Sequence, residues 1–119
     1  MRYGHRFVKT KLFKNIVTEL GAWEEVDVLK SVLDREPTAG KMIIGGNGLR
    51  KIRVALPGRG KSGGARVIYY QVVDKKVIVL LFAYAKSVID DLSPVRLKAL
   101  VRLRDEAVKV LRGETDENH

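Results

Sequence analysis

The N-terminal third of the chain shows the hydrophobic spacing of helices. Residues 5–9 alternate basic and apolar side chains, which predicts that these residues form a short strand ahead of the helices. Thr10 is a suitable N-cap for a helix that ends at Gly21. Residues 23–36 then repeat apolar side chains at helical spacing, with acids in the first turn and Pro37 after the last. The short link between the two helices predicts an antiparallel hairpin that covers one face of a sheet.

From residue 41 the spacing changes to that of strands. Apolar stretches bounded by turn residues predict four strands, at 42–44, 49–56, 65–73 and 77–84. The polar residues 74–76 predict a tight turn between the last two. Because strands that follow one another in sequence usually pair in space, we expect an antiparallel meander.

The final element is a helix that begins at Pro94, directly after the capping residue Ser93. We expect it to run to about Arg112, and residues 113–119 to form a frayed acidic tail. Its apolar stripe is wide, which allows two interpretations: the helix is sunk in its own core, or part of the stripe meets a partner protein. The pattern as a whole predicts one α+β domain over residues 1–119, with an N-terminal helical hairpin packed on a small antiparallel β-sheet and a C-terminal helix.

Composition places the protein in a broad class. The chain has 119 residues, of which 45% are hydrophobic and 31% charged, as in folded domains. It carries no apolar run long enough for a membrane span and no signal peptide pattern, so we expect a cytoplasmic protein that does not contact membranes. With no cysteine and with His5 and His119 as its two histidines, the sequence predicts no disulfide, no metal site and no cofactor.

The net charge of +9 is concentrated in one part of the chain. Residues 50–86 contain nine lysines and arginines, and Asp74 is the one acid among them. Such a block favours binding to a phosphate chain through counterion release. The alternative is a basic face kept for solubility, but solvated faces usually mix both signs.

A glycine-rich segment, residues 57–64, lies between two of the predicted strands. It matches the dinucleotide-binding glycine pattern in part, but that pattern requires a following helix, whereas a strand follows here. A phosphate-binding P-loop would need glycine where Ala55 stands, and no kinase motif follows. We therefore interpret the segment as a basic hairpin loop in which Arg59 and Lys61 contact RNA; the alternative is a plain connection between strands.

The predicted strands bring further cations together. Strand periodicity places Lys51 and Arg53 on one side, opposite to Ile52 and Val54. Three more residues of interest, Arg66, Tyr84 and Lys86, fall at the ends of the next strands, where antiparallel order would bring them to the same face. Tyr69 and Tyr70 are expected to be core or partly buried residues.

The segment from residue 48 to residue 92 resembles the HigB branch of the RelE/ParE toxin superfamily. The resemblance rests on the stretches GLRKIRVA (48–55), GRGKSGGARVIYY (58–70), YAK (84–86) and DL (91–92). The order of two helices, a strand meander and a final helix is also similar. The resemblance implies a RelE-like fold whose concave sheet face receives RNA, and cleavage of mRNA in the A site of the 70S ribosome. It also implies a cognate antitoxin, HigA-like and with a helix-turn-helix.

The resemblance also implies roles for individual residues. The catalytic candidates are Lys51, Arg53, Arg66, Lys86 and Tyr84, and the RNA-binding candidates are Arg50, Arg59 and Lys61. Ser87 departs from the pattern, because some members of the superfamily have a further arginine there.

RNA cleavage without a metal uses the ribose hydroxyl as nucleophile and needs a base, an acid and positive charge at the phosphate. An arginine stays protonated, so we assign Arg53 and Arg66 to charge stabilisation. Lys51 and Lys86 remain as base and acid, in either order. Two other functions are open at this stage: a ParE-like poison of DNA gyrase, and a nucleic-acid-binding module without catalysis.

Overall fold

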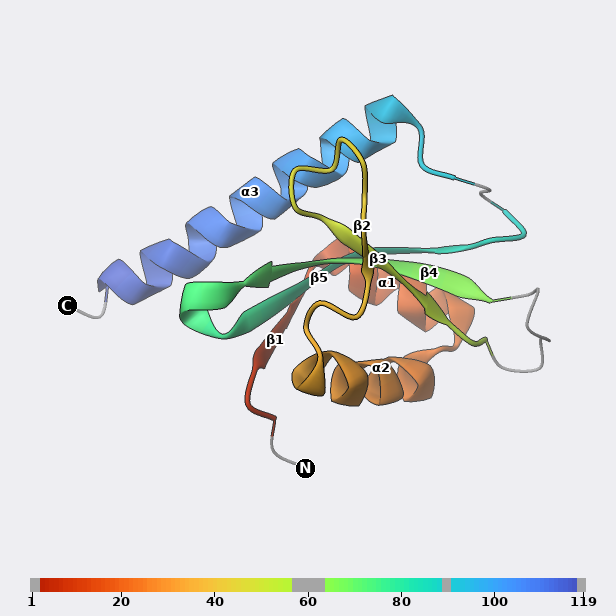
Figure 1. The fold of residues 1–119 in the computed structure, drawn as a ribbon, viewed down its shortest axis with the longest axis horizontal. Helices are drawn as coiled ribbons and strands as arrows, with labels where there is room; N and C mark the ends of the chain where they lie inside the picture. The colour runs from red at the N-terminus through yellow and green to blue at the C-terminus, as the bar shows by residue number, and fades with distance from the viewer. Residues whose placement is uncertain (1–2, 57–63, 89–90, 118–119) are drawn as a thin grey trace.

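The chain forms a five-stranded sheet with helices on both faces. The computed structural model describes residues 3–56, 64–88 and 91–117. Its elements in chain order are β1 (Arg6–Lys9), α1 (Lys11–Leu20), α2 (Trp23–Arg35), β2 (Lys41–Met42), β3 (Arg50–Val54), β4 (Ala65–Val72), the 3-10 turn η2 (Val73–Lys75), β5 (Val77–Ala85) and α3 (Pro94–Glu117). Helices α1 and α2 lie on one side of the sheet, and α3 crosses the other (Figure 1). This is the α+β arrangement that the sequence predicts.

The strand order is β1-β5-β4-β3-β2. The predicted antiparallel meander is confirmed for β2 to β5. The sequence also predicted a strand at residues 5–9 but gave it no partner. In the structure β1 pairs with β5 in parallel, from Arg6 opposite Val77 to Lys9 opposite Leu80. Parallel pairing follows because the α1–α2 hairpin and the meander intervene between the two strands, and a long connection of this kind lets β1 and β5 run in the same direction.

The first helix begins and ends as predicted. The Thr10 hydroxyl accepts a hydrogen bond from the Phe13 N–H at 3.0 Å and donates one to the Leu81 carbonyl at 2.8 Å. The cap thus also fastens the start of α1 to the central strand β5. Gly21 ends the helix in the left-handed conformation, with φ 63°, which glycine adopts without strain.

Strand β2 is shorter than predicted, because the chain turns away after Met42. Ile43 and Ile44 belong to a loop whose backbone bonds join Ile43 N–H to the Leu49 carbonyl at 3.0 Å and Gly46 N–H to the Ile43 carbonyl at 2.9 Å. Gly45, Asn47 and Gly48 all have positive φ, which continues the turn. The prediction of a strand through residue 44 was therefore wrong: apolar side chains mark the segment, but Ile44 is 98% exposed.

Each face of the sheet has its own hydrophobic core. The first core joins α1 and α2 to side chains such as Val67, Tyr69, Ile78 and Leu80. The second joins α3 to side chains that point to the opposite face of the sheet, including Ile68, Val79, Leu81 and Tyr84. Because β4 and β5 are apolar on both sides, they are buried between two layers of helices.

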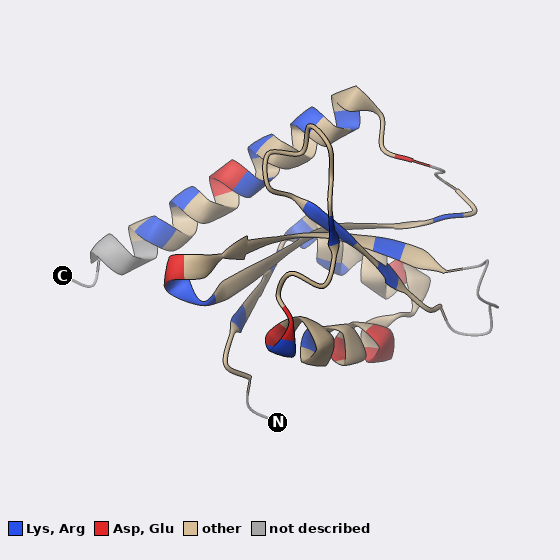
Figure 2. Cartoon of the chain, viewed as in Figure 1, with Lys and Arg blue, Asp and Glu red and all other residues tan. Residues whose placement is uncertain are grey.

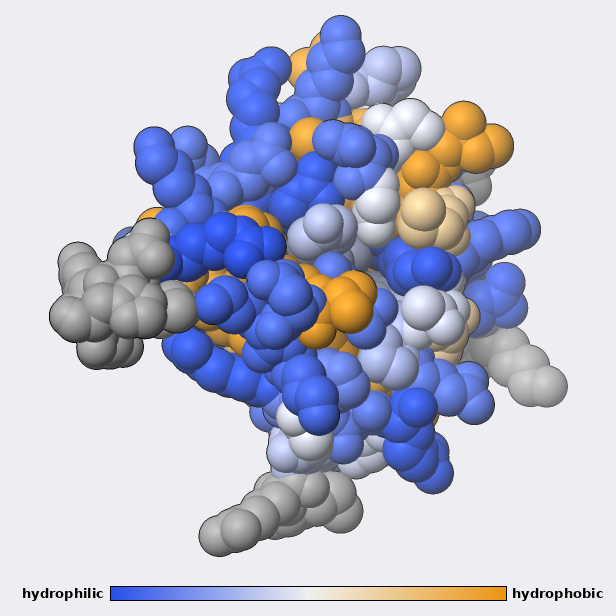
Figure 3. Space-filling model, turned by 60° about the vertical axis from the view of Figure 1, so that its left-hand side comes forward, coloured by the Kyte–Doolittle hydropathy of each residue, from blue (hydrophilic) through white to orange (hydrophobic). Residues whose placement is uncertain are grey.

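Helix α3 packs along the second face for most of its length. Seven apolar residues of its stripe contact the second core, namely Leu97, Leu100, Val101, Leu103, Ala107, Val108 and Leu111. This packing supports the interpretation of a helix sunk in its own core. Val110 of the same helix is exposed, and the face drawn in Figure 3 is mostly hydrophilic, with its hydrophobic side chains in separate patches.

Helix α3 continues to Glu117, beyond the end that the sequence predicted at Arg112. Residues 113–117 are helical where a frayed tail was expected, because Gly113 keeps a negative φ and no proline follows to stop the helix. Near this end Arg112 donates two hydrogen bonds to the carboxylate of Asp74, at 3.0 and 3.2 Å, and so joins α3 to the η2 turn. In the described part of the chain, no helix combines the length and the hydropathy that crossing a membrane requires.

Candidate nucleic-acid interface

Three cations lie on the α3 side of the sheet, where the helix does not cover it. Arg53 of β3 is paired in register with Arg66 of β4, which is paired in turn with Tyr84 of β5. Cross-strand partners point to the same face, and so does Lys51, two residues before Arg53. We call Lys51, Arg53 and Arg66 the cation row. Figure 2 shows basic residues along the central strands, whereas acidic residues gather on α2.

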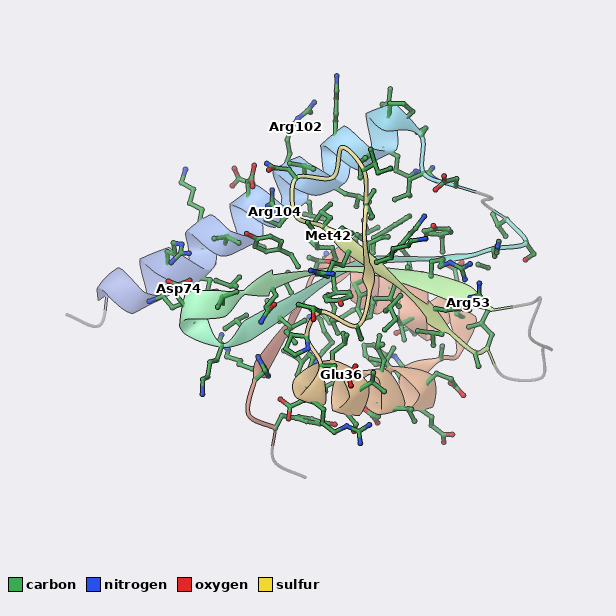
Figure 4. All side chains as sticks on the ribbon, viewed as in Figure 1. Glu36, Met42, Arg53, Asp74, Arg102 and Arg104 are labelled. Atoms are coloured by element: carbon green, nitrogen blue, oxygen red, sulfur yellow. The ribbon has the colours of Figure 1, made fainter. Side chains whose placement is uncertain are left out.

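The row is open to solvent and rests on a rigid base. Arg53 is exposed, and Lys51 and Arg66 are half-buried. Figure 4 places Arg53 near the end of β3, away from α3. Because β3 and β4 are held by their ladder of hydrogen bonds and by two cores, the three cations have little freedom in their backbone positions.

An irregularity in β5 decides which aromatic residues share this face. Ile68 pairs with Phe82, but the next residue, Tyr69, pairs with Leu80, so Leu81 is an extra residue in β5. Leu81 and Phe82 therefore both pack into the second core, and Tyr84 follows on that side. A β-bulge of this kind re-aims the side chains beyond it and is common beside functional sites.

Tyr84 forms part of the floor of this face. It is 4% exposed, and its ring lies 6.0 Å from that of Phe82, centroid to centroid. Lys86, two residues further on, is exposed, and its backbone N–H donates to the Gly64 carbonyl at 3.1 Å. Both residues thus lie at the end of the sheet that carries the cation row.

A carboxylate that sequence reasoning did not select stands beside the row. The Oδ1 atom of Asp91 lies 3.8 Å from Nζ of Lys51. The two residues line a groove of about 250 Å³. Its other walls are Lys41, Met42, Ile43, Ile44, Leu92 and Leu97.

A fourth cation reaches the same face from α3. The guanidinium carbon of Arg96 lies 5.8 Å from the centroid of the Phe82 ring, within the range of a cation–π contact. Arg96 is in the first turn of α3, where the helix dipole opposes a positive charge and where no acid is present. The unfavourable helix position of Arg96 is a signal that sequence reasoning could have used. No such signal marks Asp91, because its position depends on the course of the connection between β5 and α3.

Arg50 is not brought together with the cation row. It pairs with Tyr69 and points to the other face, where its Nη1 donates to the carbonyls of Gly40 at 2.7 Å and Thr38 at 3.3 Å. Tyr69 donates its hydroxyl to the Pro37 carbonyl and accepts from the Gly40 N–H, both at 2.8 Å, and burial raises the pKa of this phenol. The structure thus gives Arg50 contacts that hold the loop after α2. Tyr69 is a core residue, as expected.

Two other candidates fall outside the described residues. Arg59 and Lys61 belong to the segment 57–63, which the structure does not describe. Within the ranges that are described, no group of three or more histidine, aspartate or glutamate side chains is arranged to hold a metal ion.

Comparison with known proteins gives one family and one fold. A family model described as the RelE toxin of the RelE / RelB toxin-antitoxin system matches residues 5–116. Among solved structures, an arginine-to-alanine double mutant of the E. coli toxin RelE in the free state is similar, with a TM-score of 0.58 at 15% sequence identity. The similarity covers 84% of this chain and 96% of that chain. At this identity the structural match concerns the fold, while the family match spans nearly the whole sequence.

Proposed function

The chain belongs to the RelE toxin family, and from this premise we propose that it is a metal-independent endoribonuclease that cuts mRNA in the A site of the 70S ribosome. We assign it to the HigB branch, with a HigA-like antitoxin as its cognate partner. The toxin would then act in the cytoplasm and inhibit translation until the antitoxin binds it.

The observation that carries this proposal is the register of β3 against β4. It sets Arg53 directly opposite Arg66, with Lys51 on the same face. Like charges in directly opposed positions destabilise a sheet. An arrangement that costs stability is explained if it binds a polyanion, and RNA offers a phosphate at each nucleotide to neutralise the cations.

The same cations suit the chemistry of RNA cleavage. When a ribose 2′-hydroxyl attacks the adjacent phosphate, negative charge builds up on the phosphate oxygens. Arg53 and Arg66 would stabilise that charge, because two arginines fixed by a sheet need little reorganisation during the reaction. The ribosome would supply the orientation of the message, which would restrict activity to the translating complex rather than free RNA.

The experiment that tests the proposal is expression of the chain without its antitoxin, with three measurements in one time course. These are the rate of translation, the ends of cellular mRNA, and DNA damage. We expect translation to stop first, together with new mRNA ends inside reading frames. DNA damage that appears before translation stops, while the messages are still intact, would instead indicate a ParE-like gyrase poison. Arrest with neither cut messages nor damaged DNA would indicate a binding module without catalysis.

A further inference from the structure

The carboxylate of Asp91 stands next to the cation row and forms a long, solvent-exposed ion pair with Lys51, without a hydrogen bond between them. The 3.8 Å between its Oδ1 and Nζ of Lys51 exceeds hydrogen-bond length, and its side chain is 75% exposed. The same oxygen accepts the N–H of Leu92 at 2.8 Å, which fixes the carboxylate relative to the backbone. Among the ion pairs of residues 3–56, 64–88 and 91–117, this is the one that reaches the cation row.

This position bears on a difficulty in a mechanism with two lysines. One lysine would have to be neutral to act as a base while the other stays protonated to act as an acid. A carboxylate beside a lysine avoids this requirement, because a carboxylate accepts a proton and an ammonium group donates one.

We propose that Asp91 is the general base of RNA cleavage and that Lys51 is the general acid. This inference rests on the proposed function. Asp91 takes the proton of the ribose 2′-hydroxyl, and the 2′-oxygen forms a bond to phosphorus. The bond from phosphorus to the 5′-oxygen breaks, and that oxygen takes a proton from Lys51. The products are a 2′,3′-cyclic phosphate and a 5′-hydroxyl end, and exchange with water restores both side chains.

The groove lined by Lys51 and Asp91 is where the ribose would bind. Its apolar walls include Leu92, Leu97 and the partly exposed Met42, which would exclude water from one side of the nucleotide. The loop that forms one wall is held by its own backbone bonds and by a hydrogen bond of 2.9 Å from Arg104 to the Asn47 carbonyl. A wall held in this way presents a preformed surface for the nucleotide beside Lys51 and Asp91.

The first test is the pH dependence of single-turnover mRNA cleavage on programmed ribosomes, between about pH 6 and pH 8.5. If a carboxylate accepts the proton and a lysine donates one, the rate of the wild-type protein should lack the steady rise with pH that a base which must first lose its own proton would give. Asp91→Asn should be slower by about 10²- to 10⁴-fold at neutral pH. Its residual rate should rise with pH as hydroxide takes over the role of the base. A wild-type rate that rises steadily with pH would overturn the proposal in favour of a lysine base.

The second test separates the base from the acid. A message with sulfur in place of the 5′-oxygen at the cleaved bond has a leaving group that needs no proton. The rate of Lys51→Gln should return toward that of the wild type on this message, whereas Asp91→Asn should stay slow. Glu106→Gln, which removes an exposed acid of α3, is the matched control and should cut both messages normally.

Three outcomes are then decisive. Asp91→Asn that cuts at the wild-type rate refutes a catalytic role. Asp91→Asn that is restored by the sulfur message shows that Asp91 acts through Lys51, and so refutes its role as base. A wild-type protein that cuts no message on any ribosome complex refutes the proposed function and this inference together.

Discussion

Replacement of Arg104 by alanine tests how α3 is held against the sheet. Arg104 is 4% exposed, and its guanidinium carbon lies 4.2 Å from the centroid of the Tyr70 ring. Its Nη1 donates to the Asn47 carbonyl at 2.9 Å and its Nε to Asp105 Oδ1 at 2.7 Å. Figure 4 shows Arg104 between α3 and the sheet. The side chain therefore joins the helix to the loop that lines the groove beside Lys51.

The expected loss of stability follows from these contacts. A hydrogen bond from a charged group contributes about 1.5–3 kcal/mol, and a desolvated cation–π contact about 2 kcal/mol. The cost of burying the guanidinium is recovered on substitution, which reduces the net effect. Asp105 is 62% exposed and can return to water, so the variant leaves no buried charge behind. We expect Arg104→Ala to lower the free energy of unfolding by about 3 kcal/mol, or the melting temperature by about 12 °C.

Urea and thermal unfolding followed by circular dichroism measure this effect. The matched control is Arg102→Ala, because Arg102 is an exposed arginine of the same helix that points away from the sheet (Figure 4). The control should change the free energy of unfolding by less than about 0.5 kcal/mol. If Arg104→Ala is as stable as Arg102→Ala, the anchoring role assigned to Arg104 is wrong.

Three other predictions concern stability and the reaction. Gly40→Ala should cost about 1–3 kcal/mol in urea unfolding, because the new Cβ would lie 2.6 Å from Cε1 of the buried Tyr69. The hydrogen bond from the His5 ring lowers the pKa of Asp34 in the folded protein. The stability that this bond contributes is thus present above the unfolded pKa of about 3.9 and is lost as pH falls through the folded value, so Asp34→Asn should show a shallower acid transition than the wild type. Chelators should leave cleavage unchanged while ribosomes are kept intact, and a loss restored by one divalent ion would contradict a mechanism that uses side chains alone.

Local signals explain how much of the fold the sequence predicted. The start of α1 followed from Thr10 and its end from Gly21, because capping depends on one residue and its nearest neighbours. The four strands of the meander followed from their spacing and turns. The partner of β1 did not, because parallel pairing with β5 joins segments about 70 residues apart and no local pattern encodes it.

In the candidate site too, the residues placed by strand register were predictable, and the residue placed by a long connection was not. Arg53 and Arg66 face each other because antiparallel register brings the end of one strand to the start of the next. Arg50 differs from its neighbours because alternation turns it to the opposite face, which its sequence position already implied. Asp91 lies in the DL stretch (91–92) of the family resemblance, but its place beside Lys51 was beyond sequence reasoning, since that distance depends on the path of the connection that leads from the sheet to α3.

The measurement that tests the central claim most directly is the single-turnover rate at which purified protein cuts a defined message in the ribosomal A site. We predict that the wild-type protein cuts within the A-site codon and that Arg66→Ala is slower by about 10²- to 10³-fold, as for the loss of one group that stabilises transition-state charge. Its unfolding midpoint should equal that of the wild type or lie slightly above it, because Arg66 is half-buried on an open face and its removal relieves the repulsion from Arg53. Arg102→Ala should cut at the wild-type rate. A folded Arg66→Ala protein that cuts as fast as the wild type would show that the cation row is not the site of RNA cleavage.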